Sequence, residues 1–287
     1  MKLMGSSEIL TLVFRVSRFR FWFYLAGPYS VGCIWATKNY LNLLEPGFFI
    51  YMAYFLIPAN ILLYGINDYF DFDTDQFNVK KGDKEHLLKQ KEKGRLKFII
   101  ISIILSSLAL IMTMNYIEAI LFGAFLLLCI FYSTPPLRFK ALPIIDSSSN
   151  ILYAIPGIFA FYRVSGVLPA PQILLLAFLH TFSMHLFSAI PDIESDQMAG
   201  LRTTATVLGA KASEFVCLSA WSAFSLITIL TSSFNPFSFL TLIYPLMIVT
   251  LLITDMKIGK AYWLFPYINI GLGATLFLIA AFRTPWS

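Results

Sequence analysis

The sequence predicts an all-α membrane protein, and three observations lead to that class. Of its 287 residues, 58% are hydrophobic and only 13% are charged, whereas about a quarter of a soluble domain is charged. The mean hydropathy is +0.74. The apolar residues fall into runs of about twenty, the length of a helix that crosses a bilayer. We expect a single transmembrane domain over residues 1–287, with nine helices around a central cavity and two weakly similar halves, about 15–140 and 141–287.

The expected membrane spans are separated by polar connections. The first follows several arginines and lacks a small-residue cleavage site, so no removable signal peptide is evident. The fifth contains Pro156-Gly157, and we expect it to kink or to begin late. The nine spans are residues 21–37, 47–66, 98–114, 117–132, 144–162, 172–190, 214–231, 237–254 and 261–282.

Lys and Arg are distributed unevenly between the two sets of loops. With the N-terminus in the cytoplasm, 18 of the 21 basic residues fall on the cytoplasmic side, and only Lys38, Arg163 and Arg283 fall outside. Because basic loops favour the cytoplasm, we expect a multi-pass protein of the cell membrane with a cytoplasmic N-terminus and an outer C-terminus. The net charge of +5 is then a topology signal, and no nucleic-acid partner is expected.

A run of aspartates ends the second span. Asp68, Asp71 and Asp75 are spaced by three and four residues, so on a helix they share a face, whereas Asp73 points elsewhere. Carboxylates at the mouth of a membrane helix are costly unless something neutralises them. Three carboxylates on one face suit Mg²⁺, which shares its remaining positions with water and phosphate. The sequence therefore indicates a magnesium site on the cytoplasmic side.

A second aspartate pair, Asp192 and Asp196, ends another long apolar run. Either cluster alone would also fit a helix cap or a solvated loop, but two clusters at matched positions favour a metal site. A calcium loop of the EF-hand type is excluded, because Gln76 and Gly82 stand where that loop needs Gly and Glu.

Polar residues on the same helix faces add candidates for substrate binding. Tyr64 precedes Asp71 by seven positions, and His185 precedes Asp192 by seven. Seven residues make nearly two helical turns, so each pair shares a face.

Basic residues near the carboxylates indicate an anionic ligand. A diphosphate fits, because Mg²⁺ bridges its oxygens to aspartates while Lys and Arg neutralise the rest. Arg138 and Lys140 follow the rigid pair Pro135-Pro136, which directs them to a fixed place. The candidates on the cytoplasmic side are Arg18, Arg138, Lys140 and Arg202.

These motifs resemble those of the UbiA superfamily of intramembrane prenyltransferases, from about Arg15 to the end of the chain. The family motif Asn-Asp-x-x-Asp-x-x-x-Asp is matched by Asn67, Asp68, Asp71 and Asp75, and its Asp-x-x-x-Asp by Asp192 and Asp196. The resemblance implies that all six are metal ligands. It also implies catalytic roles for Asp71, Asp192 and Tyr132.

The chain departs from the family at one position. Many members have Tyr-x-x-x-Lys after the fourth helix, but Pro136 stands four residues after Tyr132. Either Arg138 or Lys140 takes the role of that lysine.

The resemblance implies Mg²⁺-dependent transfer of an allylic prenyl group from a prenyl diphosphate to a lipophilic acceptor in the membrane. Residues 17–28, the aspartate run, residues 132–146 and residues 185–192 are most similar to lycopene elongases. We therefore expect dimethylallyl transfer to lycopene, at a site open to the cytoplasm. Two alternatives stay open. One is an aromatic prenyltransferase of quinone or related prenyl-lipid biosynthesis. The other is a membrane transporter, although ionisable residues of transporters usually lie near the midplane.

Overall fold

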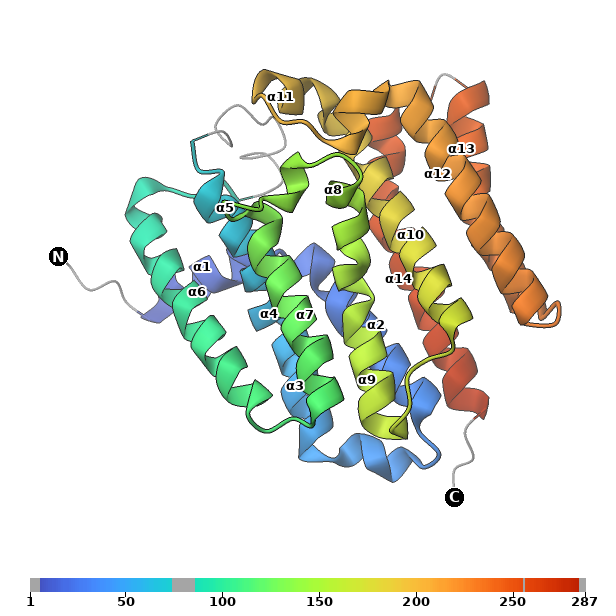
Figure 1. Ribbon diagram of the computed structural model, residues 1–287, viewed down its shortest axis with the longest axis horizontal. Helices are drawn as coiled ribbons and strands as arrows, with labels where there is room; N and C mark the ends of the chain where they lie inside the picture. The colour runs from blue at the N-terminus through green and yellow to red at the C-terminus, as the bar shows by residue number, and fades with distance from the viewer. Residues whose placement is uncertain (1–5, 74–85, 255, 284–287) are drawn as a thin grey trace. The chain divides into compact units, whose positions relative to one another are not determined.

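The computed structural model describes residues 6–73, 86–254 and 256–283, and within them every regular element is a helix (Figure 1). The predicted all-helical class is confirmed. The chain divides into two compact units. Of the described residues, unit 1 takes those up to Arg138, Ile155–Leu168 and those from Phe277 onward. Unit 2 takes Phe139–Ala154 and Pro169–Leu276.

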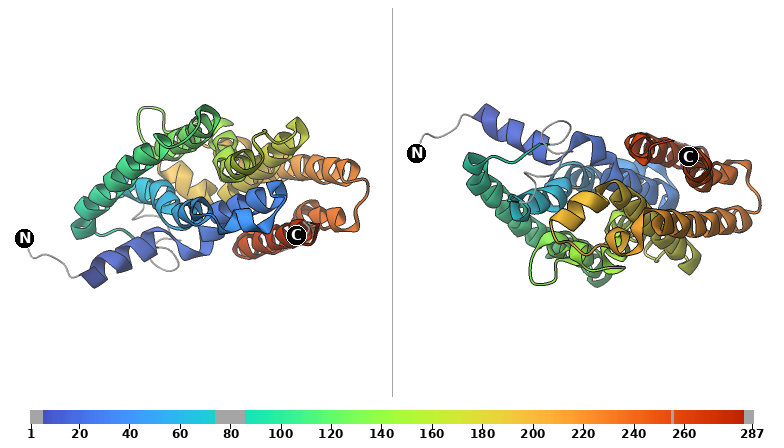
Figure 2. Two further views of the ribbon diagram at one scale, coloured as in Figure 1. Left: turned by 90° about the horizontal axis from the view of Figure 1, so that it is seen from below. Right: turned by 90° about the horizontal axis from the view of Figure 1, so that it is seen from above.

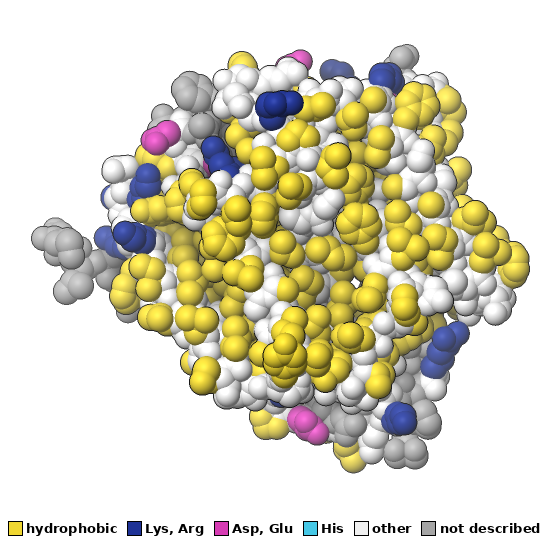
Figure 3. Space-filling view, viewed as in Figure 1, with side chains coloured by type: hydrophobic (Ala, Val, Ile, Leu, Met, Phe, Trp, Pro, Cys, Tyr) yellow, Lys and Arg dark blue, Asp and Glu magenta, His cyan; other side chains and the backbone are white. Residues whose placement is uncertain are grey.

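Seven of the described helical segments are long and apolar enough to cross a membrane. The predicted count of nine is therefore only approximate. The other two predicted spans, 21–37 and 144–162, correspond to shorter helices, α2 (Trp22–Ala36, 15 residues) and α9 (Ile155–Ser165, 11 residues). As expected from Pro156-Gly157, α9 begins late. Apolar side chains cover most of the face drawn in Figure 3, as a lipid-facing surface requires, and the chain is an integral membrane protein.

Unit 1 is held together by a close crossing of α2 and α9. Gly32 and Gly157 face each other there, and a Cβ added to Gly32 would lie 2.2 Å from the Gly157 carbonyl oxygen. Small residues let membrane helices approach in this way. The other elements of unit 1 are α1 (Ser6–Val16), η1 (Phe19–Phe21), η2 (Tyr40–Leu44), α3 (Pro46–Leu56), α4 (Pro58–Asn60), η3 (Ile61–Gly65), α5 (Ile66–Phe70), α6 (Gln90–Ile111) and α7 (Tyr116–Ser133).

The second predicted span is helical throughout but broken in its middle. Pro58 has no backbone N–H to continue the α-helix. Asn60 is completely buried, and its Nδ2 donates to the carbonyls of Phe55 and Leu56 at 2.9 and 3.0 Å. A π-helical turn, η3, follows and carries Tyr64. Turns of this kind often occur at functional sites, and this one leads directly into α5 and its aspartates.

Unit 2 packs around a completely buried Trp221. The ring of Tyr244 stacks on it at 5.2 Å, and the Trp221 Nε1 donates to the Nδ1 of His180 at 3.3 Å. Helices α12 and α13 lie against each other (Figure 2). The elements of unit 2 are η5 (Phe139–Ala141), α8 (Ile145–Ser148), η6 (Ser149–Tyr153), α10 (Pro171–Ala189), η7 (Ile190–Asp192), α11 (Ile193–Met198), α12 (Thr204–Thr231), η8 (Pro236–Leu242), α13 (Ile243–Ile253) and most of α14 (Ile258–Arg283).

Candidate functional site

The first aspartate of unit 1 is paired with an arginine from the start of the chain. Asp68 lies in α5 and is buried. The Nη2 of Arg18 donates to the Oδ1 of Asp68 at 2.9 Å. The same guanidinium lies over the Tyr64 ring, 4.6 Å from its centroid. Arg18 thus contacts two of the other residues that the sequence nominates, and its charge offsets that of the buried carboxylate.

The second carboxylate, Asp71, has two partners from different elements. The Nη2 of Arg138 donates to its Oδ1 at 3.1 Å, and the Nδ2 of Asn67 donates to its Oδ2 at 2.7 Å. Asn67 also donates to the Oγ of Ser133, at the end of α7, at 3.1 Å. Ser133 is not among the predicted site residues, although it lies next to Tyr132. Its hydroxyl ties the aspartate run to α7.

The aspartate run does not continue as a helix, contrary to the geometry assumed from its spacing. The α-helix ends at Phe70, and Asp71 caps it through a last backbone bond to the Asn67 carbonyl at 2.9 Å. A carboxylate at a helix C-terminus is disfavoured by the helix dipole, so further aspartates oppose continuation. Asp68 and Asp71 are nevertheless both buried, and Asp73 is exposed. Asp75 lies outside the described residues.

The second aspartate pair lies in unit 2. Asp192 ends η7, Asp196 follows one turn later in α11, and both are half-buried. The Oγ of Ser195 donates to the Asp192 carbonyl at 2.9 Å, which closes the turn between them. Arg202 is exposed in the segment before α12. This short helical turn therefore presents two carboxylates on one face.

Arg138 and Lys140, the two candidates for one role, have different surroundings. Arg138 is paired with Asp71 in unit 1. Lys140 is buried in η5 of unit 2. Tyr132 is half-buried in the last turn of α7. Within the described residues, Arg138 is in direct contact with the first aspartate run through Asp71.

A further acidic residue, Asp146, stands out in unit 2. The sequence shows it only as a single carboxylate inside a predicted span. It is completely buried, and its Oδ2 accepts from the Thr204 backbone N–H at 2.7 Å. The Thr204 hydroxyl donates to its Oδ1. The pair Thr203-Thr204 at the start of an apolar run was the available signal, since threonines favour helix N-termini.

The oxygen donors of unit 1 fit a hard divalent cation. Asp68 and Asp71 are carboxylates, Asn67 adds an amide oxygen, and Mg²⁺ prefers oxygen ligands. Two guanidinium groups form ion pairs with these carboxylates, because buried negative charges are stable only beside positive charge. Over the described part of the chain, no three His, Cys, Asp or Glu residues are close enough to form a metal-binding group.

Comparison with known proteins identifies the chain as a membrane prenyltransferase. A profile of the UbiA prenyltransferase family matches residues 25–283, and the chain belongs to that family. It is 38% identical over 275 residues to a lycopene elongase/hydratase of Haloarcula japonica, covering 95% of this chain and 92% of that protein. It is 38% identical over 266 residues to a protein of the same name from Halobacterium salinarum, covering 91% and 94%.

Solved structures of similar proteins have the same fold. A UbiA homologue from Archaeoglobus fulgidus, bound to DMAPP and Mg²⁺, aligns with a TM-score of 0.66 over 93% of this chain and 98% of that one, at 22% identity. An apo UbiA homologue from Aeropyrum pernix aligns with a TM-score of 0.67 over 93% and 98%, at 14% identity. At such low identities the likeness extends to the fold alone.

Proposed function

We propose that this protein transfers a dimethylallyl group from dimethylallyl diphosphate to an end of lycopene. The observation that carries the proposal is its 37–38% identity to proteins named lycopene elongase/hydratase, over at least 91% of each chain. Physical chemistry agrees. Every Lys and Arg lies outside the nine predicted spans, so an uncharged polyene is accommodated more readily than an aromatic acid, whose carboxylate needs a basic partner.

Magnesium is the proposed cofactor. Its proposed ligands are the aspartates and asparagine of the two motifs, and when bound it stabilises the negative charge of the leaving diphosphate. The oxygen donors and the burial of Asp68 and Asp71 support this assignment. The proposed ligand set is Asn67, Asp68, Asp71, Asp75, Asp192 and Asp196.

The diphosphate is the proposed ligand of the basic residues. Arg18 and Arg138 already offer guanidinium groups at the two carboxylates. A guanidinium has five N–H donors, so each can hold a carboxylate and a phosphate oxygen together. Lys140 and Arg202 are the proposed further contacts. These charges lower the cost of building up negative charge on the leaving group.

Aromatic and apolar side chains stabilise the allylic cation that forms when dimethylallyl diphosphate loses its diphosphate. In unit 1 the Tyr64 ring lies beside Arg18, and the Phe21 ring lies 5.5 Å from Tyr64. Aromatic faces attract cations, and an apolar wall keeps water from the cation. We propose that Tyr132 also stabilises the allylic cation and that His185 contacts the acceptor. The terminal double bond of lycopene then attacks the cation.

The experiment that tests the proposal is expression in a lycopene-producing host, followed by mass analysis of the pigments. We expect products of 45 and 50 carbons, and none from a host with the empty vector. Unchanged lycopene in a host that makes the protein, together with prenylation of 4-hydroxybenzoate or a naphthoate by its membranes, would contradict the acceptor. Absence of Mg²⁺-dependent diphosphate release would contradict a prenyltransferase and favour the alternative function, a membrane transporter.

The proposed orientation places the diphosphate site in the cytoplasm, with the N-terminus on the same side and the C-terminus outside. Single cysteines at Gln90 and Asn235, in a chain without Cys33, Cys129 and Cys217, test it. An impermeant thiol reagent added to intact cells should label position 235 and not position 90. Labelling of position 90 from outside would reverse the orientation.

A further inference from the structure

Among the described residues, the buried carboxylate of Asp146 accepts its hydrogen bonds from uncharged donors. Besides Thr204, the backbone N–H of Ser147 donates to its Oδ1 at 2.7 Å. Within the described residues no Lys or Arg forms an ion pair with it. The N–H of Thr204 is one of the donors at the start of α12 that have no acceptor within the helix itself, and the helix dipole favours an anion there. These hydrogen bonds fix the position of the Asp146 carboxylate.

His185 is the ionisable neighbour of this carboxylate. It lies near the end of α10, and both α8 and η6 pack against α10 (Figure 1). The Asp146 carboxylate and the His185 imidazole interact electrostatically. His185 is half-buried. It precedes Asp192 by seven residues on the same face, or about 10 Å along a helix. That separation leaves room for a five-carbon chain between a diphosphate at Asp192 and the imidazole.

The other membrane histidine has different surroundings. His180 lies on the same helix, but its Nδ1 accepts the Trp221 N–H at 3.3 Å, and its ring packs against Tyr244 at 4.9 Å and Phe224 at 5.3 Å. These contacts account for His180 as a packing residue of the aromatic core. His185, by contrast, lies on the helix against which α8 and its Asp146 pack.

A buried hydroxyl next to Asp146 adds a second observation. Ser147 is completely buried, and its Oγ has no hydrogen-bond partner in the described parts of the chain. A buried hydroxyl without a partner is costly, and buried waters commonly complete such groups. The position beside Asp146 is therefore suited to hold a water molecule.

The proposed reaction needs a proton acceptor. When the lycopene double bond attacks the dimethylallyl cation, one carbon–carbon bond forms and the positive charge moves to a tertiary carbon of the acceptor. That cation is discharged in one of two ways. It loses a proton from an adjacent carbon and gains a double bond, or it adds water, which then loses a proton, and becomes a tertiary alcohol. Each route releases one proton.

We propose that His185 is the base that accepts this proton, from carbon or from the added water, and that the Asp146 carboxylate, on a helix packed against α10, stabilises its protonated form. The inference rests on the proposed function. The imidazole nitrogen takes the proton, and the nearby Asp146 carboxylate favours the imidazolium through its charge. The proton then passes to solvent, and the imidazole returns to its neutral form.

The test compares the parent with His185→Gln and, as a matched control on the same helix, His180→Gln. Each protein is given dimethylallyl diphosphate, Mg²⁺ and lycopene in water enriched in oxygen-18. Diphosphate release, elongated products and labelled alcohol are measured together. For His185→Gln we expect diphosphate release within roughly threefold of the parent, because a general base contributes its hundredfold or more only to the step that it serves. Elongated product per diphosphate, and the ratio of alcohol to alkene, should change by about tenfold or more. His180→Gln should keep the parent's ratios.

Three results would overturn the assignment. An unchanged product ratio in His185→Gln would identify another base, such as the released diphosphate. Parallel losses in both histidine variants would mean that His185 is structural. If the parent itself makes no elongated carotenoid, the proposed function fails, and this inference with it. Should His185→Gln not accumulate in membranes, His185→Asn, which keeps a polar group near the position of Nδ1, is measured against the same three results.

Discussion

Two arginine–carboxylate pairs in unit 1 have nearly the same geometry. One agrees with the helix dipoles and backbone preferences around it, and the other goes against them. Arg138 and Asp71 are 3.1 Å apart, with 34% and 7% of their side chains exposed. Arg163 and Glu118 are 3.0 Å apart, with 34% and 8% exposed. Distance and burial therefore do not distinguish them.

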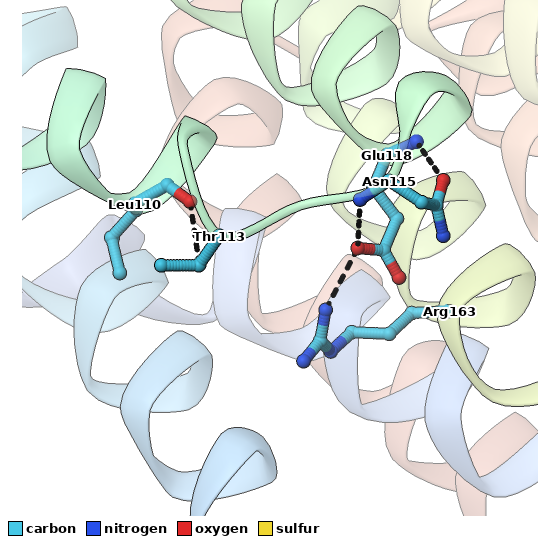
Figure 4. Close-up of polar contacts among 5 residues, drawn as sticks. All are labelled: Leu110, Thr113, Asn115, Glu118 and Arg163. Atoms are coloured by element: carbon cyan, nitrogen blue, oxygen red, sulfur yellow. Dashed lines mark hydrogen bonds and ion pairs between the residues drawn. The ribbon is translucent and has the colours of Figure 1, made fainter.

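The Glu118 pair satisfies every local preference. Glu118 lies in the first turn of α7, where it forms a capping box with Asn115 (Figure 4). Arg163 lies in the last turn of α9 and also covers the Tyr51 ring, 4.8 Å from its centroid. An acid at a helix start and a base at a helix end both complement the helix dipole. This pair is arranged for stability.

The Asp71 pair goes against those preferences. Asp71 follows the end of α5, where the helix dipole disfavours an anion. Arg138 has a φ of 40°, and Arg18, the partner of Asp68, has a φ of 52°. Residues other than glycine pay about 1–2 kcal/mol for this left-handed conformation. Sites that bind ligands often hold strain of this kind. Backbone strain and the unfavourable position at a helix end therefore distinguish the Asp71 pair from the Glu118 pair, whereas distance and burial do not.

The largest predicted effect is at Asp71. Asp71→Asn removes one charge from the proposed metal site, and we expect transfer to fall on the order of a thousandfold. Glu118→Gln should leave the activity per folded protein unchanged. Asp73→Asn, at an exposed position of the same run, should be much milder. Product formation in membranes with equal amounts of each protein measures this, and equal losses at Asp71 and Asp73 would contradict the account.

A smaller effect is expected at Arg18. Arg18→Gln removes the guanidinium shared by Asp68 and Tyr64, and the lost charged hydrogen bonds should lower kcat/KM for the diphosphate roughly tenfold to a hundredfold. The control is Arg15→Gln, since Arg15 lies exposed in the last turn of α1. Steady-state kinetics at varied dimethylallyl diphosphate test this. A similar loss in both variants would point to a general charge effect at the membrane surface.

The smallest predicted effect is at the opposite end of α7. Asn115→Ala removes the side chain that accepts from the Glu118 backbone N–H at 3.0 Å. Loss of such a cap costs about 1 kcal/mol of stability. Thermal unfolding in detergent should begin at a lower temperature, with activity per folded protein unchanged. A loss of activity without a loss of stability would contradict this prediction and indicate a functional role for the N-terminal end of α7.

The sequence predicts the helices well where apolar runs are uninterrupted. The predicted span 117–132 corresponds to α7 at Tyr116–Ser133. Prediction is poorer where a side chain forms the hydrogen bonds that backbone N–H groups form in a regular helix. The break at Pro58 depends on Asn60, whose amide reaches two carbonyls that a regular helix would satisfy itself. Spacing alone does not reveal such a substitution.

The site is predictable in its residue types but less so in its pairings. Carboxylate spacing indicates a metal site, and loop position nominates the arginines. The sequence does not show that Arg138 pairs with Asp71, because this pairing depends on how the chain turns after Pro136. The contacts of Asp146 are not evident from the sequence, because its partner Thr204 is 58 residues away in the chain.

The most direct test of the comparison measures Arg138→Gln and Arg163→Gln side by side, for both diphosphate release and thermal stability. Arg138→Gln should lower kcat/KM about tenfold or more while Asp71 keeps its bond from Asn67. Arg163→Gln should leave kcat/KM unchanged and cost about 1–3 kcal/mol of stability, because Glu118 stays buried without its charge partner. Equal losses of activity and stability in the two variants would contradict the assignment of one end to catalysis and the other to the fold.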